Sequence, residues 1–381
     1  MSRPRLVSRH AMTAAAVLLS LSTLAACGSD DGGSGSGSGS GEVPAEVTQL
    51  VEDNLANPTS LGYDTPLSKP VPSDIKIVAL QVPVDVAKVE GEAMRKAAES
   101  LGWSYETVVV GDGPEAPAKA FDQAIDKKPD GIYYSGYTTQ SISQQLERAA
   151  SEGIAVFSEA LGADTPEQAF AQIRNTPAVK RLAELNAAWI VADSGGAADV
   201  LIVDTPAFPI LHEYSEQVKT SIEGWCSGCS VTITDANVTD IGTKLPAQIV
   251  SELQRSPQTN YLVFSFGDLT IGLNPALAAA GLQGKVKVTG QLPGLDNLKS
   301  LETGENAMWV PELSPLIGWR VIDAFARHFV GDDPEVAADG SPTPTQLLTP
   351  ENVGSAVYDP SGYWVGVDGY EGAFKKLWNV G

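Results

Sequence analysis

Residues 75–82 have the sequence IKIVALQV, a nearly unbroken apolar run rich in β-branched side chains. Such a run predicts a β-strand that is buried on both faces. A stretch with helical spacing, EAMRKAAESL at 92–101, follows it. Three more strand-like runs come next, at Tyr105–Val110, Gly131–Tyr134 and Ile154–Ser158. Strands that alternate with helices in this way indicate βαβ units and a parallel sheet.

The same pattern repeats in the second half of the chain. Further strand-like runs occupy Val200–Asp204, Val231–Thr234, Tyr261–Ser265, Val286–Thr289 and Ala307–Val310. Helical segments fill the gaps, for example Ala178–Val191. Two such series predict an α/β fold of two similar lobes, each built on a parallel sheet. Ligands bind outside the carboxyl ends of strands in open α/β sheets, so we expect the site in the loops that follow the strands.

The composition is that of a globular, acidic protein. The 381 residues are 43% hydrophobic, and 47 acidic side chains stand against 25 basic ones, for a formal charge of −22. Nucleic acids and anionic lipid surfaces are therefore poor partners, because binding them needs cationic surface. Only three histidines are present, and His10 lies in the first segment. A metal site built from several histidines is excluded as well.

The first 41 residues predict export. Arginines at 3, 5 and 9 precede a mostly apolar run at 11–24, which is too short for a permanent membrane span but suits a signal peptide over residues 1–26. The sequence LAACG at 24–28 resembles the lipobox of bacterial lipoproteins, which implies cleavage before Cys27 and lipidation of that cysteine. The alternative is an ordinary signal peptide. A Gly/Ser tract then completes a flexible tether over residues 27–41.

Two cysteines remain after Cys27, and export to an oxidising compartment favours their pairing. Cys226 and Cys229 follow a helical segment and precede a strand. In redox-active CxxC pairs a helix N-terminus stabilises the thiolate, whereas this pair lies at a helix C-terminus. We therefore expect a structural disulfide rather than a redox site, and a zinc ribbon would need a second CxxC.

The segments outside the alternating pattern also carry signals. The extension at 42–73 includes a short helix predicted at 44–56, which should dock on the body. Residues 331–344 are acidic and Gly/Pro-rich, which indicates a solvated loop, because the aspartates lack calcium-ligand spacing. Residues 353–380 hold six aromatic side chains, so this stretch should pack against the fold.

Several landmarks in order resemble the type I periplasmic (solute-binding) proteins, the ribose- and galactose-binding class of ABC importers, over about 74–332. They are IKIVAL at 75–80, LGW at 101–103, KPDGIY at 128–133, AASEGIAV at 149–156 and YLVFSFGD at 261–268. The resemblance implies two lobes joined by a hinge of three crossovers, near 173–177, 312–315 and about 346–357. It places 74–174 with about 313–345 in lobe 1, and 175–312 with about 346–381 in lobe 2.

The pocket of the resembled sugar binders is changed here. The loop after the first strand, 83–87, is shorter and lacks an aromatic residue. In the resembled family an Asp-Arg pair usually follows the fourth strand, and Glu159 stands at that place here. Tyr214 stands where the family has a ligand-binding Arg, and Gln291 or Leu292 stands where it has an Asp. Glu312 stands where a Gln meets the ligand. A simple sugar and a less polar, aromatic-bearing ligand both remain open.

The candidate ligand contacts lie after strands and at the crossovers. They are Tyr137, Glu159, Asn175, Phe208, Tyr214, Asp268, Gln291 and Glu312. Asp268 has the strongest support because the family position is acidic, although an Asp there can also cap a helix beginning near Ile271. Tyr137 and Glu159 can instead be surface loop residues.

Two further polar residues have alternatives of their own. Asn175 can instead form a turn before Pro177. We expect His212 on a helix face rather than at the ligand.

The leader and the resemblance together imply an extracytoplasmic binding lipoprotein that passes a small, sugar-like solute to an ABC permease. A tethered sensor protein is the alternative. No enzyme activity, cofactor, metal or nucleic acid is expected, because no nucleophile elbow, phosphate loop or dinucleotide motif follows a strand. The resemblance implies a monomer that contacts the membrane only through the lipid on Cys27.

Overall fold

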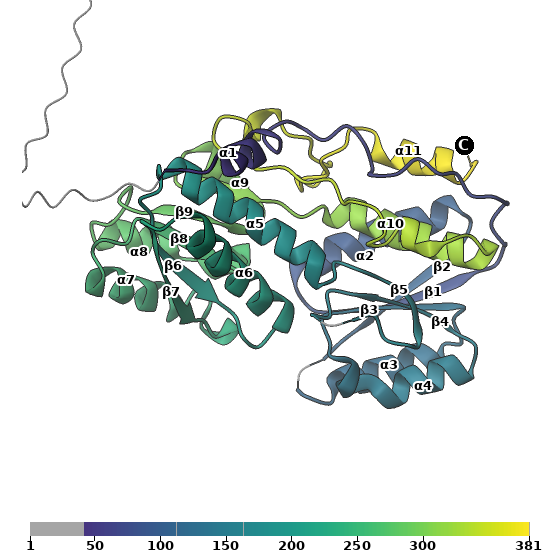
Figure 1. The fold of residues 1–381 in the computed structure, drawn as a ribbon. Helices are drawn as coiled ribbons and strands as arrows, with labels where there is room; N and C mark the ends of the chain where they lie inside the picture. Colours follow the sequence, from purple (N-terminus) through teal and green to yellow (C-terminus); the bar gives the residue numbers. More distant parts are fainter. Residues whose placement is uncertain (1–41, 112, 163, 381) are drawn as a thin grey trace, which may run out of the picture. The chain divides into compact units, whose positions relative to one another are not determined.

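The computed structural model describes residues 42–111, 113–162 and 164–380. The predicted signal peptide, lipidated Cys27 and tether lie outside the described residues. Ten strands in this part of the chain form two five-stranded parallel sheets, shown in Figure 1. This arrangement confirms the predicted α/β fold with two lobes. We call the lobe built on the first five strands lobe 1 and the other lobe 2.

The sheet of lobe 1 has the strand order β2-β1-β3-β4-β5. The strands are β1 (Lys76–Gln81), β2 (Ser104–Val109), β3 (Gly131–Ser135), β4 (Ala155–Glu159) and β5 (Ala169–Ile173). The first four match the predicted runs, whereas β5 was not predicted. Its sequence, AFAQI, is poor in β-branched residues, and it pairs only with β4 through an irregular register.

Alternating side chains of the lobe 1 sheet pack against helices on its two faces. Ile77 and Ala79 belong to a core shared with α2 (Asp85–Ser100) and α10 (Ser314–Val330). Val78 and Leu80 point the other way, into a core shared with α3 (Ala116–Asp126) and α4 (Ser143–Ser151). The period of two in this burial is that of a strand covered on both faces.

The sheet of lobe 2 has the order β10-β9-β8-β6-β7, again entirely parallel. The strands are β6 (Asp199–Asp204), β7 (Ser230–Asp235), β8 (Tyr261–Phe264), β9 (Lys287–Gln291) and β10 (Met308–Val310). All five match predicted runs. In both sheets the order reverses beside the first strand of the lobe, which is the arrangement that opens a crevice at the carboxyl edge.

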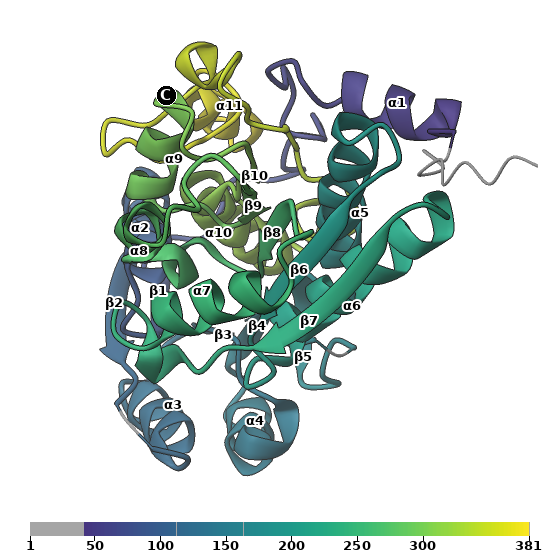
Figure 2. The ribbon, with the colours of Figure 1, turned by 90° about the vertical axis from the view of Figure 1, so that its left-hand side faces the viewer.

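Helices cover both faces of the lobe 2 sheet, as Figure 2 shows. Val200 and Ile202 pack towards α5 (Thr176–Asp193) and α6 (Pro209–Trp225). Leu201 and Val203 pack on the opposite face, which carries α7 (Leu245–Arg255), α8 (Leu273–Ala279) and α9 (Leu295–Glu302). Short 3-10 helices complete the described secondary structure: η1 (Thr139–Ile142), η2 (Val238–Asp240), η3 (Gly267–Thr270), η4 (Pro334–Val336) and η5 (Val353–Ser355).

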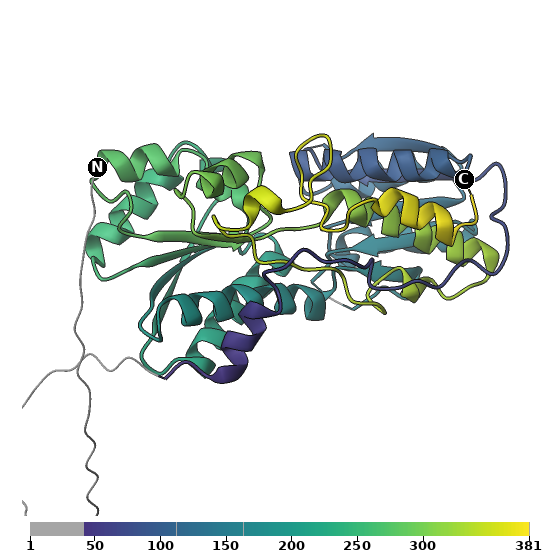
Figure 3. The ribbon, with the colours of Figure 1, turned by 90° about the horizontal axis from the view of Figure 1, so that it is seen from above.

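The N-terminal extension at 42–73 contacts both lobes. Its helix α1 (Ala45–Glu52) confirms the predicted docked helix, since it packs on α5 with Val47 wholly buried. The following segment runs beside α10 and α11 (Tyr370–Leu377), as Figures 1 and 3 show. There the amide of Leu67 donates to the carbonyl of Leu377 at 2.8 Å.

The aromatic C-terminal stretch packs down as predicted. Trp364, Phe374 and Trp378 are buried, and Trp378 stacks on Trp319 of α10 at 5.3 Å between ring centroids. The resemblance predicts that about 346–381 belongs to lobe 2. In the structure this segment contacts both lobes, because η5 touches α9 whereas α11 packs on α10.

Residues 331–344 were expected to form a solvated loop. Much of the loop is accessible, but Ala337 and Ala338 are buried, and their carbonyls accept hydrogen bonds from Arg320. The expectation therefore holds for only part of this segment.

The predicted disulfide is present between Cys226 and Cys229. It joins the end of α6 to the start of β7, at the amino edge of the lobe 2 sheet. Across the described ranges, no helix has both the length and the apolar character that a membrane span requires.

Candidate functional site

The carboxyl edge of the lobe 2 sheet carries a row of buried polar side chains. Thr205 follows β6, Ser265 follows β8, and Gln291 ends β9; all three are buried. The hydroxyls of Thr205 and Ser265 are 2.8 Å apart, and Gln291 Nε2 donates to the carbonyl of Ser265 at 3.1 Å. Gln291 Oε1 is buried without a hydrogen-bond partner among the described residues. This edge therefore presents an acceptor that can take a proton donor.

A charged cluster lies where the carboxyl edge of lobe 1 meets the crossovers. Arg174 follows β5, and its guanidinium lies 2.5 Å from Glu159 Oε1, 2.7 Å from Glu312 Oε2 and 3.1 Å from Glu90 Oε2. The Tyr133 hydroxyl contacts both Glu90 and Glu159. Glu90, Glu159 and Tyr133 are buried, and the Arg174 side chain is 17% exposed. We call these five residues the Arg174 cluster.

Local structure explains how the Arg174 cluster is assembled. Glu159 is the last residue of β4, and Glu312 lies two residues beyond the end of β10. Glu90 comes from α2, which can approach α10 closely because Gly318 has no side chain. A Cβ there would lie 2.7 Å from the carbonyl oxygen of Glu90. The cluster therefore gathers two strand ends, a crossover and a helix that are far apart in sequence.

The backbone of the first crossover is fixed by Asp339. The amides of Arg174 and Asn175 donate to its two carboxylate oxygens at 3.1 and 2.7 Å. Arg174 has φ = 56°, in the left-handed region that most side chains avoid. Such a conformation persists only where the surroundings impose it, so the position of the guanidinium is set by the crossover itself.

Burial dominates the electrostatics of the Arg174 cluster. It raises the pKa of Glu90 well above its usual value, and the charge of Glu159 adds to this rise. It also raises the pKa of Glu312 to about 7, although Arg174 opposes the rise. Burial lowers the pKa of Arg174, but the three carboxylates outweigh burial and raise it above its ordinary value. The arginine therefore stays charged, while Glu90 and Glu312 hold protons more readily than free carboxylates do.

A second acidic group lies at the edge of the sheets. Partial desolvation by neighbouring groups raises the pKa of Asp268, although the residue is exposed to solvent, and the nearby charge of Asp85, at the start of α2, raises it further. Burial also raises the pKa of Tyr363, with Asp85, Asp268 and Asp359 contributing in that order. Tyr363 belongs to a turn in which its amide donates to Asp359 Oδ1 at 2.9 Å. The C-terminal segment thus brings an aromatic side chain to residues of both lobes.

The carboxyl edges also carry the large exposed apolar side chains of the described residues. These are Val84, Val109, Phe208, Val238, Ile271 and Leu295, each in or just after the end of a strand. Two hollows open at the same edges. One of about 330 Å³ lies between Pro206 and Gln248 in lobe 2, and one of about 490 Å³ lies between Val109 and Gln123 in lobe 1. Polar groups with apolar neighbours are typical of small-molecule sites.

The structure brings together only some of the predicted site residues. Glu159 and Glu312 meet through Arg174, and Gln291 lies at the same edge as Glu312. Asn175 is adjacent, but its side chain accepts from the amide of Ala178 and so begins α5. Asp268 is exposed in η3 and makes no side-chain cap of α8.

The aromatic candidates lie in different surroundings. Tyr137 is half-buried against the α3–α4 core, and Phe208 is exposed at the start of α6. Tyr214 is wholly buried, and its hydroxyl accepts from Asn186 at 2.9 Å. It therefore lies inside lobe 2 rather than at the carboxyl edge. His212 lies on α6 with its Nδ1 2.6 Å from Asp204, which is the helix-face position expected for it.

Sequence reasoning missed Glu90, Tyr133, Arg174, Thr205 and Ser265. One signal was available, because Glu90 precedes Ala93, Met94 and Ala97 at the spacing of a buried helix face. Arg174 followed a strand that was not predicted. Within the described ranges, no group of three or more His, Cys, Asp or Glu side chains is arranged to hold a metal ion.

The sequence of residues 86–333 matches a family described as a periplasmic binding protein domain. No curated protein sequence matches the chain.

Solved structures show the same fold at low sequence identity. A periplasmic ribose ABC transporter protein from Conexibacter woesei is 18% identical, with a TM-score of 0.66 over 76% of this chain and 96% of that one. A solute-binding protein from Thermotoga lettingae, in complex with 5-methylthioribose, is 15% identical, with a TM-score of 0.64 over 76% and 90%. One from Bacillus halodurans with bound myo-inositol is 16% identical, with a TM-score of 0.59 over 76% and 98%.

Proposed function

Because this chain belongs to the periplasmic binding protein family, we propose that it is an extracytoplasmic protein that captures a small polar solute between its two lobes. The observation that carries the proposal is the Arg174 cluster. It joins Glu159, at the carboxyl edge of lobe 1, to Glu312, which follows the last strand of lobe 2. A ligand at this point can contact both lobes, as capture between lobes requires.

A sugar or polyol is the ligand class that this chemistry favours. Carboxylates and a buried amide oxygen accept hydrogen bonds from hydroxyl groups. Glu159, Glu312 and the unpartnered Oε1 of Gln291 supply such acceptors at adjoining edges. The bound ribose derivative and inositol of the similar structures support the same class.

Ligand capture works through a shift in the population of lobe arrangements. A solute that contacts both lobes favours the closed arrangement by the difference in its affinity for the two states. The crossovers at 174–175 and 311–313 are short connections between the sheets, and they are where the backbone would bend. The closed protein would then pass its ligand to an ABC permease in the membrane.

The N-terminal sequence supports attachment to the outer face of the cell membrane. The LAACG motif would place a lipid on Cys27, and the Gly/Ser tract up to residue 41 would form a tether. Metabolic labelling with a radioactive fatty acid tests this directly. Label should enter the protein and disappear in Cys27→Ser; label retained in Cys27→Ser would contradict the anchor.

Thermal-shift measurement on the purified protein tests the ligand class. The panel contains monosaccharides, polyols, nucleosides, amino acids and aromatic acids. A ligand that binds only the folded state must raise the Tm. We expect shifts from sugars or polyols; shifts from aromatic acids alone would show that the fold is kept while the ligand class differs.

A variant pair tests the location of the site. Asp268→Ala should weaken binding of the responding ligand without lowering the Tm of the free protein, because the side chain is exposed. The matched control is Asp296→Ala, an exposed aspartate on α9. Equal affinity of the two variants in calorimetry would remove Asp268 from the site.

A further inference from the structure

Arg174 pairs with three carboxyl groups, of which Glu90 and Glu159 are buried and the Glu312 side chain is 9% exposed. Within the described residues, this one guanidinium forms the ion pairs of Glu90, Glu159 and Glu312. The Tyr133 hydroxyl contacts both Glu90 and Glu159 and can donate its one proton to either of them. One positive charge therefore faces three acidic groups, and the cluster keeps an excess of acceptors over donors.

The geometry makes Arg174 a bridge between two connections rather than part of one lobe. Glu159 belongs to β4, whereas Glu312 lies on the crossover that leaves β10. The two terminal nitrogens of the guanidinium divide between them, with Nη1 on Glu159 and Nη2 on Glu312. A planar guanidinium can hold two carboxylates in this way, whereas a lysine presents only one point charge.

Asp268, after the third strand of lobe 2, has a charge of the same sign. It lies near Asp85, which pairs with Lys88 at 2.8 Å, whereas no ion pair joins Asp268 to a base within the described residues. A ligand would therefore meet hydrogen-bond acceptors both beside Arg174 and at Asp268. Hydroxyl and amine groups suit such surroundings, and a carboxylate or phosphate is repelled.

We propose that Arg174 is a positioning and specificity-determining residue, which holds Glu159 and Glu312 as acceptors for the ligand and leaves an acidic site that takes neutral or amine-bearing sugars but rejects anionic ones. This inference rests on the proposed function. It adds the residue that organises the site and the charge class of the ligand.

The first test needs no variant. The Kd of the purified protein is measured by calorimetry for matched triplets: glucose, glucosamine and glucuronate, and galactose, galactosamine and galacturonate. In any triplet that binds, the neutral or the amine-bearing sugar should bind at least tenfold more tightly than the uronate. A uronate that binds as tightly as its neutral counterpart overturns the proposal.

The second test replaces the guanidinium. Arg174→Gln should weaken binding of the neutral sugar at least tenfold, and Arg174→Lys should recover part of the loss. In Arg174→Gln, the affinity for the amine-bearing sugar relative to the neutral one should rise several-fold, because the ligand ammonium can replace the missing charge. A merely structural arginine would not change this ratio, so an unchanged ratio overturns the proposal.

Arg148 provides the matched control. It also pairs with three carboxylates, Asp122, Asp126 and Glu152, but on the exposed surface of α4. Arg148→Gln should leave both Kd values unchanged, and an effect equal to that of Arg174→Gln would contradict a special role for the cluster. If Arg174→Gln does not fold, the proposal is still tested by the triplet comparison and by the Kd of Arg174→Lys.

The two proposals fail in different ways. If no probe in the wider panel binds the unaltered protein, the proposed function fails and this inference falls with it. If the unaltered protein binds a neutral sugar but Arg174→Gln binds it equally well, only the inference fails.

Discussion

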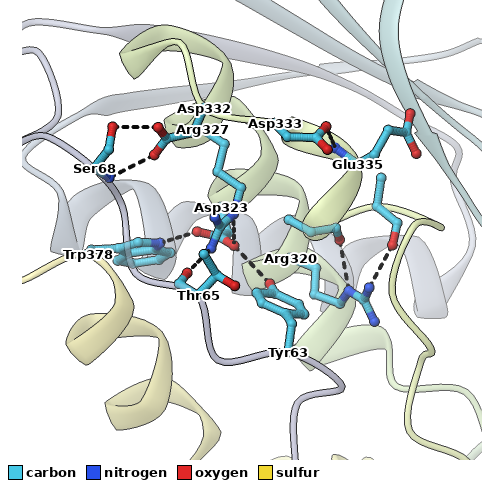
Figure 4. A network of polar contacts seen from close by, with 12 residues as sticks. Tyr63, Thr65, Ser68, Arg320, Asp323, Arg327, Asp332, Asp333, Glu335 and Trp378 are labelled. Atoms are coloured by element: carbon cyan, nitrogen blue, oxygen red, sulfur yellow. Dashed lines mark hydrogen bonds and ion pairs between the residues drawn. The ribbon is translucent and has the colours of Figure 1, made fainter.

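The hydroxyl of Tyr63 donates to Asp323 Oδ2 at 2.8 Å and so fastens the N-terminal extension to α10, 260 residues further along the chain. Asp323 also accepts from Trp378 Nε1 at 2.7 Å and from Arg327 Nε at 2.9 Å. Figure 4 shows these contacts converging on one carboxylate. The N-terminal extension and α11 together therefore cover a polar stripe of α10 that would otherwise face water.

The contact between Tyr63 and Asp323 should contribute to stability. Tyr63→Phe should lower the free energy of unfolding by about 1–3 kcal/mol, because a part-buried hydrogen bond to a carboxylate is lost. Chemical denaturation measures this. The control is Tyr358→Phe, which loses a half-buried hydrogen bond to the neutral carbonyl of Val353. Equal losses in the two variants would contradict a special role for the Asp323 contact.

Close packing at Gly318 should be needed for both stability and binding. A Cβ at this position would lie 2.7 Å from the Glu90 carbonyl, so Gly318→Ala should cost about 1–3 kcal/mol and displace Glu90. Gly224→Ala in α6 is the control, because its Cβ would meet no atom within 4 Å. An unchanged Tm in Gly318→Ala would show that the helices separate without cost.

Glu312 should make stability depend on pH. Its pKa is raised to about 7 by burial, so the folded protein holds a proton that the unfolded chain has released. Stability from this group is complete below about pH 4.5 and is lost as the pH rises to about 7. The free energy of unfolding should fall less between pH 5 and 7.5 in Glu312→Gln than in the unaltered protein, by about 1–3 kcal/mol.

Denaturation curves at several pH values measure this effect. Glu152→Gln, which changes an exposed carboxylate on the surface, is the control. Identical pH slopes in Glu312→Gln and the unaltered protein would contradict the account of Glu312.

The disulfide should stabilise the protein without affecting the ligand. Cys226→Ser removes a bridge that closes a very short loop, for which chain entropy gives about 2 kcal/mol. The bridge lies at the amino edge of the lobe 2 sheet, opposite the edge that carries the polar row. A Kd that changes while the Tm does not would contradict this division.

The sequence was sufficient to predict nine of the strands because each is rich in apolar, aromatic or β-branched residues. It could not show β5, whose alanines and glutamine carry little strand preference. Because β5 was not predicted, Arg174 was not recognised as a site residue, since it is marked as one only by its position directly after β5. The partners of Arg174 come from β4, α2 and the crossover after β10, and local patterns do not reveal which of these meet in space.

Other misplacements have the same origin. Tyr214 follows a strand in sequence, but it lies far enough into α6 to face the core. The polar stripe of α10 has the spacing of an exposed helix face, yet it is covered by segments from both ends of the chain. Local periodicity indicates which side chains share a face but not what covers that face.

The most direct test of the central claim is a crystal structure of the protein with the sugar or polyol that gives the largest thermal shift. The account predicts electron density for the ligand between the ends of β4 and β10, with its hydroxyls about 2.6–3.2 Å from carboxylate oxygens of Glu159 and Glu312. Density only in the hollow between Pro206 and Gln248, without contact to either glutamate, would contradict it.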